Sequence, residues 1–423
     1  MNLKITEEDL RKVRFEQFKD AVILLFGIFG LSFVIPAYIY VMLHFLASSD
    51  LSKAILLAIF YSELLIFAIL TPHVSFLLEI TRSAIGRRTP YLLTFGTFVA
   101  FFLTAIRNAT VDEKSITAII VIILGFNFSM YFYSLTLLGL MNDRKTYLTE
   151  KFLESQWKFW SVIGIISSYL YSWKLCTDGR TISHVSLLFL ISVFAVSFLI
   201  IEDKKFKVKI SPDEKAEIYE KYKNEKTLKV KFEKPQITDL KRFFSLVITY
   251  QFLFLLPIHM AYVTDTPKSQ IEITGAKVLL FYSFGVICNY ILHRVIKNTS
   301  SIFQKMGHVT IASVLFIFST TFFISSITWS LMVAFVMGFL LFPTLSKYFY
   351  VPGLGIERFI SKERAIEKNI EYYTLYLSVL LTGILFDIFG LKTAGVIAAC
   401  ILIVSLIIEL ISARAKIENT TNN

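Results

Sequence analysis

Charged side chains are scarce in this chain of 423 residues. Asp, Glu, Lys and Arg make up only 18% of it, whereas soluble domains carry roughly a quarter. Hydrophobic residues make up 55%, and apolar runs of about 20 residues, each long enough to cross a bilayer, recur along the whole length. The shortage of charge excludes an ordinary soluble domain and predicts an all-α, multi-pass protein of the cell (plasma) membrane.

Cysteine is also rare, and Cys176, Cys288 and Cys400 lie far apart in the sequence. This spacing offers neither a metal-ligand cluster nor a paired disulfide framework. The sequence also lacks a paired-Asp motif for group transfer, a His cluster and a Gly-rich phosphate cradle. We therefore expect no metal, no cofactor and no enzyme activity.

The formal net charge of +11 would suit a nucleic-acid ligand, but the placement of the basic residues argues against one. By our count, about 35 of the 43 Lys and Arg residues fall in predicted loops on one side of the membrane, which is the positive-inside bias. The basic residues therefore report topology and favour contact with anionic lipid headgroups. We expect membrane lipids, and no nucleic acid, as partners.

Twelve membrane spans are predicted, in two sets of six. They lie at 21–46, 54–78, 90–106, 116–140, 158–175, 184–202, 242–263, 275–296, 308–327, 329–350, 370–389 and 393–412. An even count with a basic start and a basic middle places both termini and the central loop in the cytoplasm. The predicted domains are an amphipathic segment at 1–20, an N-terminal half at 21–202, a charged linker at 203–241, a C-terminal half at 242–412 and a polar tail at 413–423.

Two polar segments leave alternatives open. Residues 1–20 fit an amphipathic interfacial helix capped by Thr6, or a solvated leader. In the linker, Ser211 and Pro212 are typical of a helix start, and Glu214 completes a capping box, so a short surface helix is predicted at 212–226. The linker composition fits a solvated tether between the halves, and a partner-binding surface is the alternative.

The segment 79–91, Glu-Ile-Thr-Arg-Ser-Ala-Ile-Gly-Arg-Arg-Thr-Pro-Tyr, forms a short basic turn between the second and third spans. Gly86 permits a tight turn, and Pro90 fits the first turn of the next helix. The arginines suit the end of the second helix. They either bridge neighbouring helix ends, as a latch at the cytoplasmic gate, or only enforce topology. The predicted gate residues are Glu79, Arg82, Gly86, Arg87, Arg88 and Pro90.

This turn resembles the loop between helices 2 and 3 of the major facilitator fold. It is most similar to that of the glycoside–pentoside–hexuronide cation symporters and the related sucrose carriers, which follow D-x-x-R-x-x-x-G-[RK]-x-x-P-[WFY]. The register matches without a gap, with Glu79 in place of Asp. The resemblance implies two six-helix halves that rock about a site near mid-membrane.

The resemblance extends over most of the first half but fails at its carboxylates. Ser32 and Ser129 stand where the melibiose-type carriers have sugar-binding Asp residues, Tyr133 where a Trp stacks on sugar, and Lys158 where there is an Arg. Lys158 either holds substrate or extends to the interface. Phe67 takes the position of a sodium-binding acid, which disfavours sodium coupling. The resemblance implies a sugar or related small polar solute, and the predicted substrate residues are Ser32, Asn127, Ser129, Tyr133 and Lys158.

Polar residues inside the spans are the remaining candidates. Glu63, Phe67 and Thr71 lie at i, i+4 and i+8 on one helix face. An ionisable residue in a span is a functional candidate by default, and a buried carboxylate is the simplest group to bind a coupling proton. The alternative for Glu63 is a structural acid bonded to a neighbouring helix. Asn127 and its polar neighbours on the fourth span either line a polar cavity or form interhelical hydrogen bonds. Candidates in the second half are His259, Asn289, Tyr372, Tyr373 and Tyr376, and Asp387 is expected to face water.

These features predict a secondary active transporter that works as a monomer by alternating access, with H+ as the coupling ion. One alternative is a lysolipid carrier of the same fold, since the 41 Phe residues would suit an apolar cavity. Another is a non-transporting sensor or scaffold that acts through the charged linker.

Overall fold

The computed structural model describes residues 18–34, 37–38, 51–111, 116–143, 181–200 and 211–227, with isolated residues within 163–167, 281–288, 328–336 and 373–397. A first helix covers 18–34. It is followed by α2 (Lys53–Phe60), α3 (Ser62–Ile80), α4 (Thr89–Val111), α5 (Ile116–Asp143), α7 (Thr181–Leu199) and α8 (Pro212–Thr227). The described residues between 373 and 390 are also helical, and we call them the eleventh-span helix.

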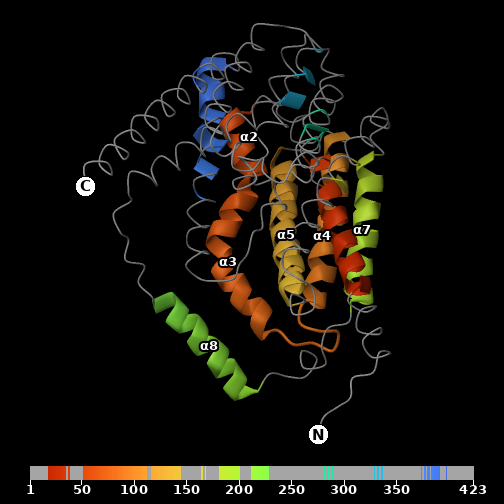
Figure 1. Ribbon diagram of the computed structural model, residues 1–423. Helices are drawn as coiled ribbons and strands as arrows, with labels where there is room; N and C mark the ends of the chain where they lie inside the picture. Colours follow the sequence, from red (N-terminus) through yellow and green to blue (C-terminus); the bar gives the residue numbers. More distant parts are fainter. Residues whose placement is uncertain are drawn as a thin grey trace, which may run out of the picture.

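The described helices form a bundle in which α4 packs against both α5 and α7, and α3 packs against α5 (Figure 1). Three of them are long and apolar enough to cross a membrane, over Thr89–Ile106, Ile116–Met141 and Ile182–Leu199. They coincide within a few residues with the spans predicted from hydropathy. Of the other predicted spans, 54–78 is described throughout and 21–46 and 370–389 in part, whereas the rest fall largely on residues outside the described part.

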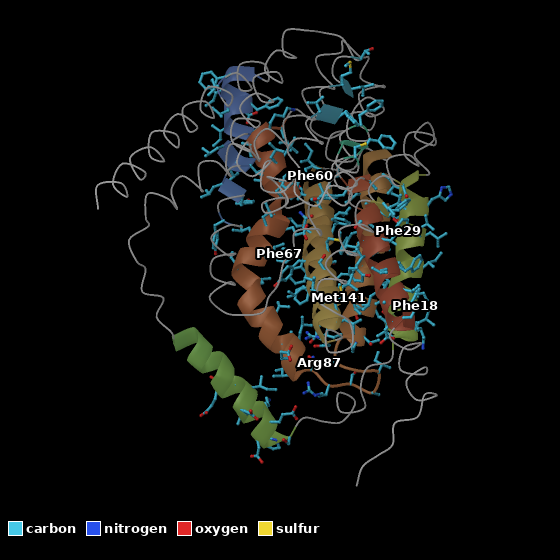
Figure 2. All side chains as sticks on the ribbon, in the orientation of Figure 1. Phe18, Phe29, Phe60, Phe67, Arg87 and Met141 are labelled. Carbon is cyan, nitrogen blue, oxygen red and sulfur yellow. The ribbon has the colours of Figure 1, made fainter. Side chains whose placement is uncertain are left out.

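Aromatic side chains fill the core between these helices. Phe67 of α3 meets Tyr131 of α5 edge to face, with ring centroids 4.6 Å apart. Phe95 of α4 stacks on Phe132 of α5 at 4.3 Å. Such offset and edge-to-face pairs add to the dispersion energy of a bundle whose helices gain no hydrophobic driving force from lipid. Phe67 lies between α3 and α5 in Figure 2.

The predicted second span at 54–78 is wrong as a single helix, because the chain breaks at Tyr61. This residue has φ −100° and ψ 15°, and it separates α2 from α3. Neither Pro nor Gly lies near the break. Kinks without these residues arise where a side chain enters the backbone ladder, and polar groups of two other segments bond to the carbonyls here.

The surface helix predicted at 212–226 is confirmed as α8. The Oγ of Ser211 accepts a hydrogen bond from the backbone N–H of Glu214 at 3.1 Å, as an N-cap requires. The other half of the predicted capping box differs, because the carboxylate of Glu214 accepts a hydrogen bond from Arg82 instead. In Figure 1, α8 extends away from the bundle, with one end near the foot of α3.

Candidate functional site

Side chains of two neighbouring segments donate hydrogen bonds to the backbone carbonyls at the break in the second span. The amide nitrogen of Asn127 on α5 donates to the carbonyls of Ile59 at 3.0 Å and Phe60 at 3.1 Å. The hydroxyl of Tyr38, a helical residue shortly after the segment 18–34, donates to the same Phe60 carbonyl at 2.9 Å. A broken helix leaves carbonyls without helical partners, and in a membrane each must be satisfied within the protein. Asn127 and Tyr38 meet this requirement.

Glu63 lies directly beyond this break, in the first turn of α3. Only 3% of its surface is exposed, and its Oε1 has no hydrogen-bond partner among the described residues. The amide of Asn127 also donates to the neighbouring Ser62 Oγ at 2.9 Å, which ties α5 to the turn that carries Glu63. Burial of a carboxylate without such bonds is costly in its charged form. The arrangement therefore suits a group that exchanges a proton.

Among the described residues, the predicted substrate ligands make contacts with different parts of the bundle. Asn127 lies at the break beside Ser62, as described above. The hydroxyl of Ser129 bonds back to the carbonyl of Gly125 on its own helix at 2.8 Å. The ring of Tyr133 lies edge to face with Phe189 of α7 at 5.0 Å. Each of these contacts joins one part of the protein to another. The role of these residues as substrate ligands therefore stays a prediction.

Two further candidates are placed differently. Ser32 is fully buried, and a Cβ built on Gly164 would come within 2.8 Å of its Cβ, so the two segments nearly touch there. Its Oγ has no hydrogen-bond partner in the part of the chain that the structure describes. Lys158 lies outside the described residues, as do His259, Asn289 and Tyr372.

The turn at 79–91 brings charged groups together at the ends of α3 and α5. Arg87 bonds to the carboxylate of Glu79 and, at 2.7 Å, to that of Asp143. Arg88 bonds to the same two acids, at 2.7 Å to Glu79 and at 3.2 Å to Asp143. We call Glu79, Arg87, Arg88 and Asp143 the arginine cluster, and Figure 2 shows Arg87 at the foot of the bundle. Each arginine thus joins the end of α3 to the end of α5.

The arginine cluster is partly shielded from solvent. Arg87 and Arg88 are 6% and 4% exposed, so their charges depend on the two acids in place of water. A Cβ built on Gly139 of α5 would lie 2.7 Å from the guanidinium carbon of Arg88. Because Gly139 has no side chain, the guanidinium of Arg88 fits against α5 at this position, and we call this space the slot. From the slot Arg88 bonds to Asp143, one turn further along α5.

The other residues of the turn at 79–91 set its backbone conformation and join it to α3 and α8. Gly86 has φ 127°, a conformation that favours glycine, as the tight-turn prediction required. Pro90 lies in the first turn of α4, also as predicted. Arg82 donates to the carbonyls of Glu79 at 2.7 Å and Thr81 at 2.9 Å, and so caps the end of α3. Its other terminal nitrogen bonds to Glu214 of α8 at 2.8 Å.

Sequence reasoning missed three of these residues. Asp143 is an acid at the end of an apolar run, which resembles an ordinary solvated helix end. Gly139 carries no signal of its own, although its spacing of one turn from Asp143 places both on one face. The sequence explains Glu214 only as part of the local helix cap. An unmatched acid opposite a basic turn is the signal that could have pointed to Asp143.

No protein-family model matches the chain, and no curated protein matches it. Solved structures do. The nucleoside transporter NupG is 13% identical, with a TM-score of 0.63, over 92% of this chain and 97% of that one. A point mutant of NupG gives a TM-score of 0.59 at the same identity. The xylose transporter XylE from E. coli, in a partially occluded inward-open conformation, is 10% identical, with a TM-score of 0.58, over 92% of this chain and 96% of that one.

These neighbours have the major facilitator fold, so the predicted all-α membrane fold is confirmed, while the count of twelve spans in two halves stays a prediction. The three apolar helices and the shared fold make the chain a multi-pass membrane protein. At 10–13% identity the likeness concerns the fold alone, and the resemblance to the sucrose-carrier branch stays a prediction.

Proposed function

We propose that the chain is a secondary active transporter that moves a sugar, nucleoside or related small polar solute across the cell membrane by alternating access. The observation that carries this proposal is the match in fold to nucleoside and xylose transporters over 92% of the chain. The resemblance of the turn at 79–91 to sugar–cation symporters supports the same solute class. Lysolipid and scaffold roles stay as alternatives.

Proton coupling at Glu63 is the second part of the proposal. The carboxyl group is buried, and in the described part of the chain its Oε1 has no hydrogen-bond partner. Phe67, one turn away on the same helix, offers no oxygen to a sodium ion and packs against Tyr131. A hard cation needs several oxygen ligands, so the α3 face favours a proton over sodium.

The arginine cluster is proposed to act as the latch of the cytoplasmic gate. Two nearly buried arginines share two acids, so the ends of α3 and α5 are held as one unit. Arg82 extends the network to α8 of the linker through Glu214. Because each acid bonds to both arginines, loss of one arginine leaves a partner for each carboxylate, while loss of both leaves none within the cluster.

The test is uptake by the full chain in proteoliposomes with an imposed pH gradient, inside alkaline. The probes are radiolabelled uridine, xylose and lysophosphatidylcholine, each with sodium or potassium. We expect uridine or xylose to accumulate, driven by the pH gradient and indifferent to sodium. Accumulation of the lysolipid alone would favour the amphiphile carrier. No movement of any probe by a folded protein would favour the sensor or scaffold.

Glu63→Gln tests the coupling site, because glutamine has the shape of the protonated acid. We expect this variant to lose pH-driven accumulation but to keep exchange of unlabelled for labelled solute. The matched control is Glu217→Gln, which makes the same change on the exposed surface of α8. Proton-driven accumulation by Glu63→Gln at the rate of the control would exclude Glu63 as the coupling site.

A further inference from the structure

The first turn of α2 is capped by an acid from the far end of the chain. The carboxylate of Asp387 accepts hydrogen bonds from Ser52 Oγ at 2.5 Å and from the backbone N–H of Lys53 at 2.8 Å. It also accepts one from the N–H of Ala54 at 3.1 Å. Helix N-termini carry unsatisfied N–H groups and partial positive charge, which an acid neutralises. Asp387 is exposed, as predicted, and it is also bonded to α2.

The contact continues along the whole of α2. A Cβ built on Gly383 would overlap the Cα of Ala54, so the two helices meet there backbone against backbone. One turn further, the hydroxyl of Tyr376 donates to the carbonyl of Ala58 at 3.3 Å. In Figure 1 the eleventh-span helix, in blue, lies beside α2. One face of α2 is thus covered by a segment of the predicted second half.

The opposite end of α2 is a break. Asn127 and Tyr38, both in the predicted first half, hold the carbonyls of Ile59 and Phe60. Their bonds keep the end of α2 on the first half, while α3 continues independently beyond Tyr61. A helix segment that is joined to its continuation by one non-helical residue can change direction there without unwinding either part, as hinges at element termini do.

We propose that α2 is the moving element of an outer gate, which Asp387 and Gly383 hold shut and which swings about Tyr61 when the site opens to the outside. This inference rests on the proposed alternating access. The bonds that opening must break come from the second half: those of Asp387 lie at the exposed end of α2, where water can replace them, and that of Tyr376 lies one turn further along, at Ala58. The bonds at the buried hinge come from the first half and persist. Glu63 lies in the first turn beyond the hinge, so a movement of α2 about Tyr61 would alter the surroundings of its carboxylate.

The first experiment measures access to α2 from outside. Ala58→Cys, on the face toward Tyr376, is introduced into the full chain after Cys176, Cys288 and Cys400 are replaced by Ser. A membrane-impermeant maleimide is the probe. We expect Asp387→Ala, which removes every acceptor that this side chain offers to the first turn of α2, to raise the labelling rate about five-fold, the factor that replacing a capping residue by alanine implies. An unchanged rate would overturn the proposal. The charge control is Glu217→Gln, which should leave the rate unchanged.

The second experiment locks the gate. The pair Ser52→Cys and Asp387→Cys is oxidised to a disulfide, and a matched pair is made at Thr104 and Ser186, which touch within the first half at 3.1 Å. We expect the first disulfide to abolish uptake of uridine or xylose and to block maleimide labelling, both reversibly on reduction. The second disulfide should leave transport intact.

Normal transport through the locked 52–387 pair would show that α2 and the eleventh-span helix do not separate, and would overturn the gate. If the parent protein moves neither solute, the proposed function fails, but the labelling experiment still decides whether α2 opens.

Discussion

The slot at Gly139 allows a sharp test of the arginine cluster, by the substitution Gly139→Ala. The added Cβ would lie 2.7 Å from the Cζ of Arg88, 2.9 Å from its Nη1 and 3.1 Å from its Nε. The overlap is with the far end of a flexible side chain, so the guanidinium moves aside at little steric cost. The movement separates Arg88 from Glu79 and Asp143, to which it bonds at 2.7 and 3.2 Å.

The expected magnitude follows from two opposing effects. Hydrogen bonds to charged groups contribute about 1.5–3 kcal/mol each. The Glu79 side chain is 45% exposed, so its share is reduced by solvent screening. Alanine in place of glycine within a helix raises the free energy of unfolding by about 1 kcal/mol. We therefore expect Gly139→Ala to lower the free energy of unfolding by about 1–2 kcal/mol.

The change in the free energy of unfolding caused by Gly139→Ala should have the opposite sign when Arg88 is absent. In an Arg88→Ala background no guanidinium occupies the slot, and Arg87 still pairs with both acids. Gly139→Ala should then stabilise the protein by up to about 1 kcal/mol. The assay is thermal unfolding in detergent for the four members of this double-mutant cycle, at one scan rate. An equal shift in both backgrounds would refute the view that Arg88 fills the space at Gly139.

Three further predictions use the same unfolding assay. Asn127→Leu removes the donor to the carbonyl of Ile59, and we expect a loss of about 2–3 kcal/mol; an unchanged midpoint would show that the break needs no such donor. Gly86→Ala forces a side chain to φ 127°, at a cost of about 1–2 kcal/mol, and a neutral effect would contradict the turn geometry. Glu214→Gln removes the negative charge of a half-exposed partner of Arg82, so the cost should stay below about 1 kcal/mol and vanish at about 1 M salt.

The parts of the fold that follow from hydropathy and capping could be predicted. The spans of α4, α5 and α7 are continuous apolar runs, and each exists as a helix within a few residues of its predicted range. The start of α8 follows from Ser211 and Pro212, because the cap and the fixed proline φ are local effects. Gly86 and Pro90 were predictable for the same reason, since turn chemistry depends on neighbours in sequence.

The break at Tyr61 and the arginine cluster depend on residues that are distant in sequence. Nothing local interrupts the second span, and the donors that open it are Asn127 and Tyr38. Likewise, Asp143 lies 56 residues from Arg87, so its role emerges only when α3 and α5 pack together. Pairings of this kind carry no periodic signal. The sequence predicts such pairings only as classes, namely arginines that bridge neighbouring helix ends and polar residues of the fourth span that bond between helices, without naming the partners.

The second span connects every feature that the proposed mechanism requires. Its C-terminal end contributes Glu79 to the arginine cluster, and its N-terminal segment α2 is capped by Asp387. Glu63 lies between them, in the turn that follows the break. A continuous helix would transmit a disturbance at Glu63 equally in both directions. In the proposed mechanism, the interruption at Tyr61 allows α2 to change direction while α3 keeps its bonds to the arginine cluster, so that the two parts of the span move separately.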